Sequence, residues 1–261
     1  MFTEARGTRI RYEMQGEKGS RIVLLHGWGC DGEMMRTLAE GLASEHRTLR
    51  LDFPGHGESG RPPEPWGVPE YAACLRETLK KLDFLPCAVI AHSFGCRVAA
   101  WAASEWPEMF TRMILTGAAG LKKPQTEEGR KQAEAFQRGK KIAKSLERVP
   151  FLRAAGERME ECLRQKYGSA DYLALDPEMR KTFVKVIGLD LRDRYPEIRQ
   201  STLLIWGDRD TETPLWMGRE MEKLIPDAGL VMLEGGSHFA FLEQAARFLT
   251  IARHFLTEEN G

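Results

Sequence analysis

The chain has 261 residues, of which 42% are hydrophobic and 29% charged, with 38 Lys and Arg residues balanced by 38 Asp and Glu residues. This length allows one large domain or two ordinary ones, and the composition is that of a globular protein rather than a disordered or fibrous one. The zero net charge disfavours nucleic acid as a partner, and no apolar run reaches the roughly 20 residues of a membrane span. The first residues do not resemble a signal peptide, so the expected location is the cytoplasm, with no membrane partner.

Residues 1–16 predict an antiparallel β-hairpin that turns at Gly7. Short apolar runs then alternate with stretches of helical spacing, a pattern typical of a mostly parallel sheet covered by helices on both faces. We therefore predict an α/β fold with the hairpin at one edge of the sheet. The predicted strands are 21–27, 48–55, 87–93, 112–117, 201–208 and 229–236, and the predicted helices are 31–45, 69–82, 94–105, 215–224 and 239–256.

The alternation is interrupted after residue 117 by more than eighty residues without a strand pattern. Such a length is too long for a bare connection, so we predict a helical insertion, or cap, at 121–195 between core segments 1–120 and 196–261. Residues 121–166 contain 13 basic and 7 acidic side chains. Two interpretations stay open: a solvated helix face, or a surface that attracts an anionic substrate or an acidic carrier protein.

Ser93 is the candidate nucleophile. The sequence Ala91-His-Ser-Phe-Gly95 follows an apolar run and precedes a helix of small residues. A nucleophile elbow requires this order of strand, sharp turn and helix, with small residues flanking the serine. Gly95 meets that requirement, and Ala91 replaces the usual glycine with the smallest side chain.

A serine hydroxyl needs a general base and a group that orients the base. His238 follows the last predicted strand, and two acids, Asp208 and Asp210, follow the strand before it. Asp210 is favoured because it lies further into the loop, whereas Asp208 is placed to cap the turn. Ser, Asp and His then occur in the chain order of an α/β-hydrolase triad. His46 and His254 fall in helical patterns and are expected to be solvated.

Backbone N–H groups that bind a tetrahedral oxyanion are the remaining requirement of acyl transfer. The turn His26-Gly-Trp-Gly29 follows the first parallel strand and can present the amide of Trp28. The residue after the nucleophile, Phe94, supplies the second amide.

Two other patterns predict no site. Residues 55–60 match G-x-G-x-x-G, but a proline cluster follows where a dinucleotide site needs a helix, so they are interpreted as a turn. The odd number of cysteines and the absence of a CxxC pair disfavour a zinc site and a disulfide framework, and the cysteines are expected to be buried packing residues. They are Cys30, Cys74, Cys87, Cys96 and Cys162. Neither a metal nor an organic cofactor is expected.

Together, these motifs resemble those of the serine α/β-hydrolases with a helical cap, over essentially the whole chain. The matching stretches are LLHGWG, LDFPGHGES, AHSFG, LLIWGDRDTETP and LEGGSHFAFLEQ. Within the superfamily, LLHGWG and the basic insertion are similar to those of the carboxylesterase and pimeloyl-carrier methyl esterase group. Ser93 disfavours the relatives that use an aspartate nucleophile, and the bulky Trp28 disfavours long triglycerides as substrates.

The resemblance implies that Ser93, His238 and Asp210 hydrolyse a small-molecule carboxylic ester through an acyl-enzyme, with the amides of Trp28 and Phe94 forming the oxyanion hole. One alternative is a carbon–carbon bond hydrolase of aromatic breakdown products that uses the same triad. A second is a ligand receptor on a hydrolase scaffold that performs no turnover.

Overall fold

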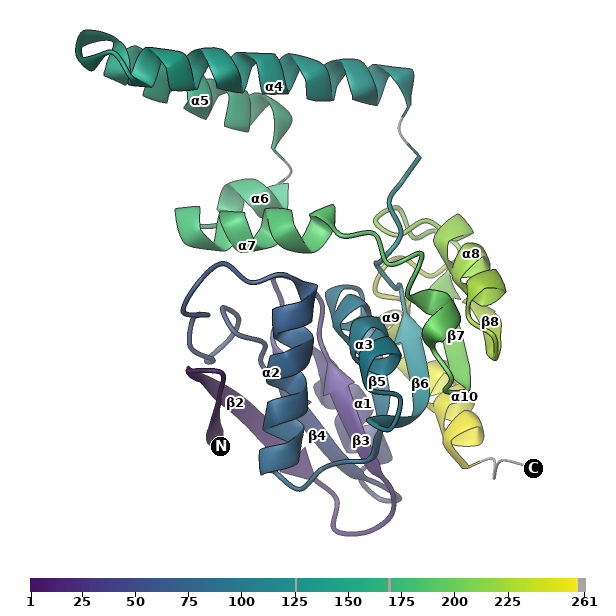
Figure 1. Ribbon diagram of the computed structural model, residues 1–261. Helices are drawn as coiled ribbons and strands as arrows, with labels where there is room; N and C mark the ends of the chain where they lie inside the picture. The colour runs from purple at the N-terminus through teal and green to yellow at the C-terminus, as the bar shows by residue number, and fades with distance from the viewer. Residues whose placement is uncertain (125, 169, 258–261) are drawn as a thin grey trace. The chain divides into compact units, whose positions relative to one another are not determined.

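The apolar runs form the strands of one eight-stranded sheet in the computed structural model, which describes residues 1–124, 126–168 and 170–257 (Figure 1). The strands are β1 (Phe2–Ala5), β2 (Thr8–Gln15), β3 (Arg21–Leu25), β4 (Arg47–Leu51), β5 (Cys87–His92), β6 (Phe110–Thr116), β7 (Thr202–Gly207) and β8 (Ala228–Leu233). Their order is β1-β2-β4-β3-β5-β6-β7-β8. β2 pairs antiparallel with β1 and with β4, and every other pair is parallel. The predicted α/β fold and edge hairpin are therefore confirmed.

The sheet has a buried apolar layer on each face. Along β3, Val23 and Leu25 belong to one buried cluster, whereas Ile22 and Leu24 belong to the other, because successive side chains of a strand point to opposite faces. The first cluster includes residues of α2 (Val68–Lys81), α3 (Phe94–Glu105) and α8 (Trp216–Leu224). The second includes residues of α1 (Arg36–Leu42), α9 (Ala240–Glu243) and α10 (Ala245–Thr257).

Three predicted elements differ from the observed ones. The helix expected at 31–45 is a 3₁₀ turn, η1 (Gly32–Met35), followed by α1, and the helix expected at 239–256 is divided between α9 and α10 at Gln244. β8 was expected to be covered on both faces but lies at the sheet edge, where Met232 is exposed. An edge strand has only one neighbour, so part of its apolar surface faces solvent.

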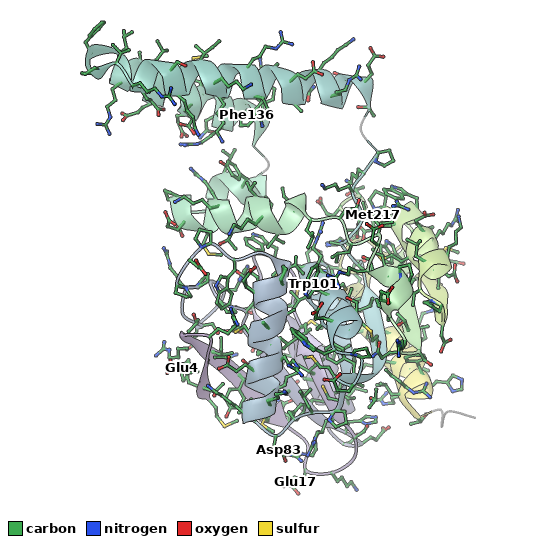
Figure 2. The ribbon with its side chains drawn as sticks, in the orientation of Figure 1. Glu4, Glu17, Asp83, Trp101, Phe136 and Met217 are labelled. Atoms are coloured by element: carbon green, nitrogen blue, oxygen red, sulfur yellow. The ribbon has the colours of Figure 1, made fainter. Side chains whose placement is uncertain are left out.

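The chain divides into two compact units, a core of Met1–Leu121 and Val184–Gly261 and a helical unit of Lys122–Phe183. The helical unit is shorter than the predicted insertion of 121–195, because Leu191 and Tyr195 are buried in the core cluster around α3. The Arg194 guanidinium also lies 4.1 Å from the ring centre of Trp101 on α3, which Figure 2 labels. Gly120 O accepts the N–H of Leu191 (2.9 Å), so the core segments before and after the helical unit are hydrogen-bonded to each other.

Helices α4 (Glu127–Glu147) and α5 (Arg153–Tyr167) form a hairpin joined by the 3₁₀ turn η2 (Pro150–Leu152) (Figure 1). Apolar residues at helical spacing in QAEAFQRGKKIAKSLERV and ERMEECLRQKY predict these two helices. No individual prediction was made for α6 (Ala170–Ala174), α7 (Pro177–Gly188) or the 3₁₀ turn η3 (Tyr195–Glu197). Phe136 of α4, labelled in Figure 2, lies with its ring centre 5.7 Å from that of Tyr167 on α5. The amphipathic spacing that predicted the two helices therefore serves their mutual packing.

Some single-residue expectations are wrong. His46 is buried just before β4 rather than solvated in a helix, and its Nδ1 lies 2.8 Å from the Ser20 hydroxyl. His254 is exposed, as expected. Of the five cysteines, all of which are free thiols, Cys162 is exposed and Cys30 is only half-buried. Among the residues that the structure describes, none of the helices combines the length and the apolarity that a membrane crossing requires.

Candidate active site

Ser93 occupies a strained turn between β5 and α3, with φ +49° and ψ −106°. A non-glycine residue in such a conformation costs on the order of 1–3 kcal/mol and is held by its surroundings. Thr116 O accepts the N–H of Ser93 (3.1 Å), and His26 O accepts the N–H of Gly95 (3.1 Å). A Cβ at Gly95 would lie 2.7 Å from Leu25 O, so only glycine allows α3 to approach β3 this closely. The ends of β3 and β6 thus fix the turn.

The acid–base candidates pair in the structure. His238 Nδ1 lies 2.8 Å from Asp210 Oδ2, and the Asp210 carboxylate is buried. Asp210 Oδ1 accepts the backbone N–H groups of Glu212 (2.9 Å) and Thr213 (2.8 Å). Burial raises the pKa of Asp210, but the hydrogen bonds from His238 and Thr213 outweigh it and hold the pKa below its usual value. Asp210 is therefore ionised near neutral pH and can accept the Nδ1 proton of His238.

The second acid, Asp208, has another partner. Its Oδ1 accepts the N–H of Gly235 at 2.7 Å, on the exposed side of the loop. Asp208 thus links the loops after β7 and β8, and it is Asp210 that contacts His238.

His92 connects the serine turn with the histidine. It directly precedes Ser93, and its ring centre lies 4.6 Å from that of His238. Burial, reinforced by the nearby His238, lowers the pKa of His92 to about 3, and its Nδ1 lies 3.1 Å from Thr116 O. The ring beside His238 is therefore neutral.

Gly117, at the end of β6, makes room for the pair. Its φ is +51°, and a Cβ there would lie 3.1 Å from His238 Nδ1 and 3.3 Å from Asp210 Oδ2. Sequence reasoning missed Gly117, whose only signal was its place after a strand. It also missed Thr213, which lies in the quoted stretch DRDTETP three residues after Asp210.

The two oxyanion candidates lie side by side. The ring of Trp28 is edge-on to that of Phe94, with centres 5.2 Å apart, and also edge-on to His56 at 4.8 Å. Phe94 begins α3, where the first N–H groups of a helix have no partner within the helix. A Cβ at Gly27, next to Trp28, would lie 3.4 Å from Ser93 Cβ, so the turn after β3 approaches the serine closely.

His26 fixes this turn from within the core. Its Nε2 accepts the N–H of Phe53 (2.9 Å), so the proton resides on Nδ1, which donates to Gly27 O (2.7 Å). Burial, together with the neighbouring His56, lowers the pKa of His26 to about 3. The neutral ring therefore links the backbone of the turn after β3, at Gly27, to the backbone after β4, at Phe53.

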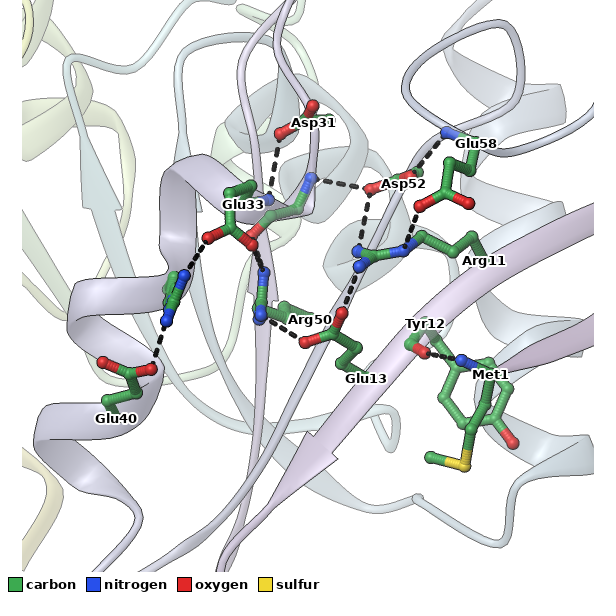
Figure 3. A network of polar contacts seen from close by, with 12 residues as sticks. Met1, Arg11, Tyr12, Glu13, Asp31, Glu33, Glu40, Arg50, Asp52 and Glu58 are labelled. Atoms are coloured by element: carbon green, nitrogen blue, oxygen red, sulfur yellow. Dashed lines mark hydrogen bonds and ion pairs between the residues drawn. The ribbon is translucent and has the colours of Figure 1, made fainter.

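Asp52 joins the turn after β3 to the turn after β4 (Figure 3). Its Oδ1 accepts the N–H of Gly32 (2.7 Å), its Oδ2 accepts the N–H of Glu58 (2.8 Å), and Arg11 lies 3.7 Å from the same carboxylate. The second turn contains the G-x-G-x-x-G pattern, which is a turn as predicted.

The buried Arg50 extends this network (Figure 3). It donates to Gly32 O (3.2 Å), to Glu33 (2.6 Å) and to Glu13 of β2. Because Asp52 binds the N–H of Gly32 and Arg50 binds its C=O, side chains at the end of β4 hold the segment that follows Trp28.

Comparisons with known proteins identify the family of the chain. A family model described as the alpha/beta hydrolase family matches residues 22–251. The chain is 24% identical to a pimeloyl-(acyl-carrier protein) methyl ester esterase of Aliivibrio salmonicida, over 97% of this chain and 98% of that protein. It is 27% identical to the protein of the same name from Aeromonas hydrophila, over 92% of this chain and 96% of the other.

Solved structures show the same fold. An enol-lactonase from Burkholderia xenovorans aligns with a TM-score of 0.75 and 24% identity, over 99% of this chain and 100% of that one. A meta-cleavage product hydrolase from Pseudomonas fluorescens aligns with a TM-score of 0.74 and 22% identity, over 100% and 98% of the two chains. The family model covers most of the sequence, and solved structures share the fold over nearly the whole chain. The resemblance seen in the motifs is therefore confirmed: the chain belongs to the alpha/beta hydrolase family.

Proposed function

We propose that this hydrolase is a cytoplasmic enzyme that cleaves small carboxylic esters through an acyl-enzyme on Ser93. The observation that supports the proposal most strongly is the strained Ser93 turn beside His238, which is hydrogen-bonded to the buried Asp210. Strain at a serine between strand and helix is a feature that a purely structural turn does not need.

In the proposed reaction, Ser93 Oγ attacks the ester carbonyl carbon while its proton passes to His238 Nε2. The carbonyl oxygen becomes an oxyanion, which the N–H groups of Trp28 and Phe94 stabilise. The intermediate collapses when the carbon–oxygen bond to the alcohol breaks and His238 returns the proton to the leaving oxygen. Water then repeats the sequence, with its proton taken by His238, and releases the acid and free Ser93.

Asp210 holds the Nδ1–H tautomer of His238 and stabilises the imidazolium that forms in each half-reaction. Its ionised state and its Oδ2···Nδ1 distance of 2.8 Å support this role.

We also propose that the helical unit acts as the cap that selects the substrate, and that it favours an anionic ester or an ester on an acidic carrier protein. Residues 121–166 contain 13 basic and 7 acidic side chains, in support of an electrostatic contribution. The similarity to proteins named pimeloyl-(acyl-carrier protein) methyl ester esterase points the same way.

Carbon–carbon bond hydrolysis is a second candidate, because a meta-cleavage product hydrolase shares the fold over the whole chain. A vinylogous diketone substrate, assayed beside a p-nitrophenyl ester, separates the two reactions by their relative kcat/KM.

The first prediction is that Ser93→Ala abolishes turnover of a p-nitrophenyl ester while the protein stays folded. Removing one member of a cooperative triad costs roughly 10⁴–10⁶ in kcat. A fluorophosphonate probe should label wild type at Ser93, as read by peptide mass spectrometry, and should not label the variant.

Ser104→Ala is the matched control, since Ser104 lies on the same helix α3 and its hydroxyl bonds Trp101 O. It should turn over the ester like wild type. A tenth or more of wild-type activity in Ser93→Ala would place the nucleophile elsewhere, and a single turnover by wild type would instead indicate a receptor.

A further inference from the structure

Thr213 lies in the loop between β7 and α8, three residues after Asp210, and only 6% of its surface is exposed. Its Oγ1 lies 2.8 Å from Asp210 Oδ2 and 3.3 Å from His238 Nδ1. A single hydroxyl thus contacts both members of the acid–base pair.

The hydrogen bonding of Asp210 defines what this hydroxyl does. Asp210 Oδ1 is occupied by two backbone N–H groups, so Oδ2 is the oxygen that faces His238. An ionised carboxylate only accepts, so the Thr213 O–H donates to Oδ2 and turns a lone pair of Oγ1 toward His238 Nδ1. The Nδ1 proton of His238 therefore points between two oxygens.

The backbone holds Thr213 in this position. The buried Trp206 of β7 donates its Nε1–H to Thr213 O at 2.7 Å, and Thr213 N is bound to Asp210 Oδ1. Thr213 directly precedes Pro214, and a proline restricts the backbone of the residue before it to extended conformations. The hydroxyl is consequently directed by rigid neighbours rather than by solvent.

We propose that Thr213 is a positioning residue of the acid–base pair: its hydroxyl orients Asp210 Oδ2 and shares the Nδ1 proton of His238 when the imidazolium forms. This inference rests on the proposed function and adds a residue to it. Because the hydroxyl contacts Asp210 and His238, its contribution is expected in the reaction step rather than in substrate binding.

Thr213→Val removes the hydroxyl and keeps the shape of the side chain. We expect kcat for a p-nitrophenyl ester to fall by about 10- to 100-fold, the range for loss of a hydrogen bond to a charged group, with KM within about twofold of wild type. Thr213→Ser keeps the hydroxyl, so the hydrogen bond to Asp210 can still form. The kcat of this variant should lie within about threefold of wild type.

Thr202→Val is the matched control. Thr202 begins β7, at the opposite end of the strand from the loop, and its buried hydroxyl donates to Gln200 O at 2.9 Å. This variant should lose stability as Thr213→Val does but keep the wild-type kcat. If Thr213→Val does not fold, Thr213→Ala tests the same loss of the hydroxyl with a smaller side chain.

A proton NMR measurement separates this inference from the proposed function, because it needs no substrate. The downfield resonance of the His238 Nδ1 proton should move in Thr213→Val and return toward its wild-type position in Thr213→Ser. A wild-type kcat and an unmoved resonance in Thr213→Val, with Ser93→Ala inactive, would overturn the role of Thr213 alone. An active Ser93→Ala variant with a moved resonance in Thr213→Val would instead overturn the proposed nucleophile.

Discussion

Two acids in one loop show how the surroundings of a residue decide its chemistry. Asp208 and Asp210 both follow β7, yet Asp208 binds the N–H of Gly235 at the surface, whereas Asp210 is buried against His238 and Thr213. A surface carboxylate that accepts one backbone N–H contributes to the stability of a turn. A buried carboxylate bonded to imidazole can also stabilise a charge that appears during a reaction.

Asp210→Asn should therefore lower kcat by roughly 10⁴, because the amide favours the wrong tautomer of His238. Asp208→Asn should retain the bond to Gly235 through its amide oxygen and change mainly the thermal midpoint. Steady-state assays of both variants, with melting curves, make the comparison. If Asp208→Asn were the inactive variant, the assignment of the acid would be wrong.

At the scale of elements, the candidate site is an arrangement of strand ends. β3, β5, β6, β7 and β8 are adjacent in the sheet and parallel, so the turns that follow them meet at one edge. The end of β6 contributes space rather than a functional group, because Gly117 leaves room for the His238–Asp210 pair.

Gly117→Ala should consequently lower kcat by more than its loss of stability explains. The added Cβ would lie 3.1 Å from His238 Nδ1 and 3.3 Å from Asp210 Oδ2, so the pair must shift slightly to accommodate it. The positive φ by itself costs about 1 kcal/mol or more in the free energy of unfolding. Chemical denaturation and kinetics on the same sample separate the two effects.

Gly7→Ala supplies the control, since Gly7 has a φ of +72° in the β1–β2 turn and nothing within 4 Å of the added Cβ. The free energy of unfolding of Gly7→Ala should fall by about as much as that of Gly117→Ala, while kcat stays at the wild-type value. Equal kcat values in the two variants would mean that the space beside His238 has no effect on turnover.

Sequence patterns predicted the elements whose form depends on local signals. Helix α3 was expected at 94–105 and is observed there, because a sharp turn begins it and small residues pack it against the sheet. The helix predicted at 31–45 is wrong in its first turn, which is a 3₁₀ turn. Asp52 and Arg50 stabilise that turn because they bind the backbone of Gly32. Those contacts join segments far apart in the chain, so helical spacing could not reveal them.

For the candidate site, as for the helices and strands, the sequence predicted only what depends on local patterns. The motifs located the turns with Ser93, Asp210 and His238, because each turn directly follows an apolar strand. They could not show that Thr213 faces Asp210, or that His46 is buried against Ser20. The direction of a side chain within a loop depends on tertiary packing, which motif spacing does not record.

At the scale of the whole molecule, charge is distributed unevenly in a chain of zero net charge. The helices of the hairpin contain pairs that offset each other, such as Glu127–Lys131 and Arg153–Glu157. Within the described part of the chain, no acidic side chain forms an ion pair with Lys140, Lys141 or Lys144 of α4. These three lysines lie within one stretch of α4, so a single variant can test whether the basic excess acts on a ligand.

Reversing Lys140, Lys141 and Lys144 to Glu should lower kcat/KM for an anionic ester, such as a monomethyl dicarboxylate, and leave a neutral ester of equal length nearly unaffected. In wild type, salt should have the same selective effect, because the Debye length falls from about 10 Å at 0.1 M to 3 Å at 1 M. Initial rates for both esters across a salt series give the measurement.

The control reverses Lys18, Lys80 and Lys223, which are exposed lysines of the core unit, and so changes the net charge equally. Equal effects of the two triple variants, or equal salt dependence of the two esters, would support a solvated helix face without a role in selection.

The hydrogen bond between the core segments on either side of the helical unit has an evolutionary consequence. Gly120 and Leu191 are joined by a backbone hydrogen bond, so the two core segments that flank the helical unit contact each other within the core. Closing a longer flexible segment costs only about 0.6 kcal/mol for each doubling of its length. Under the proposed function, insertions, deletions or recombination within residues 122–183 can therefore change which substrates are accepted while the strand ends retain the same reaction, so that specificity and chemistry can evolve at separate rates.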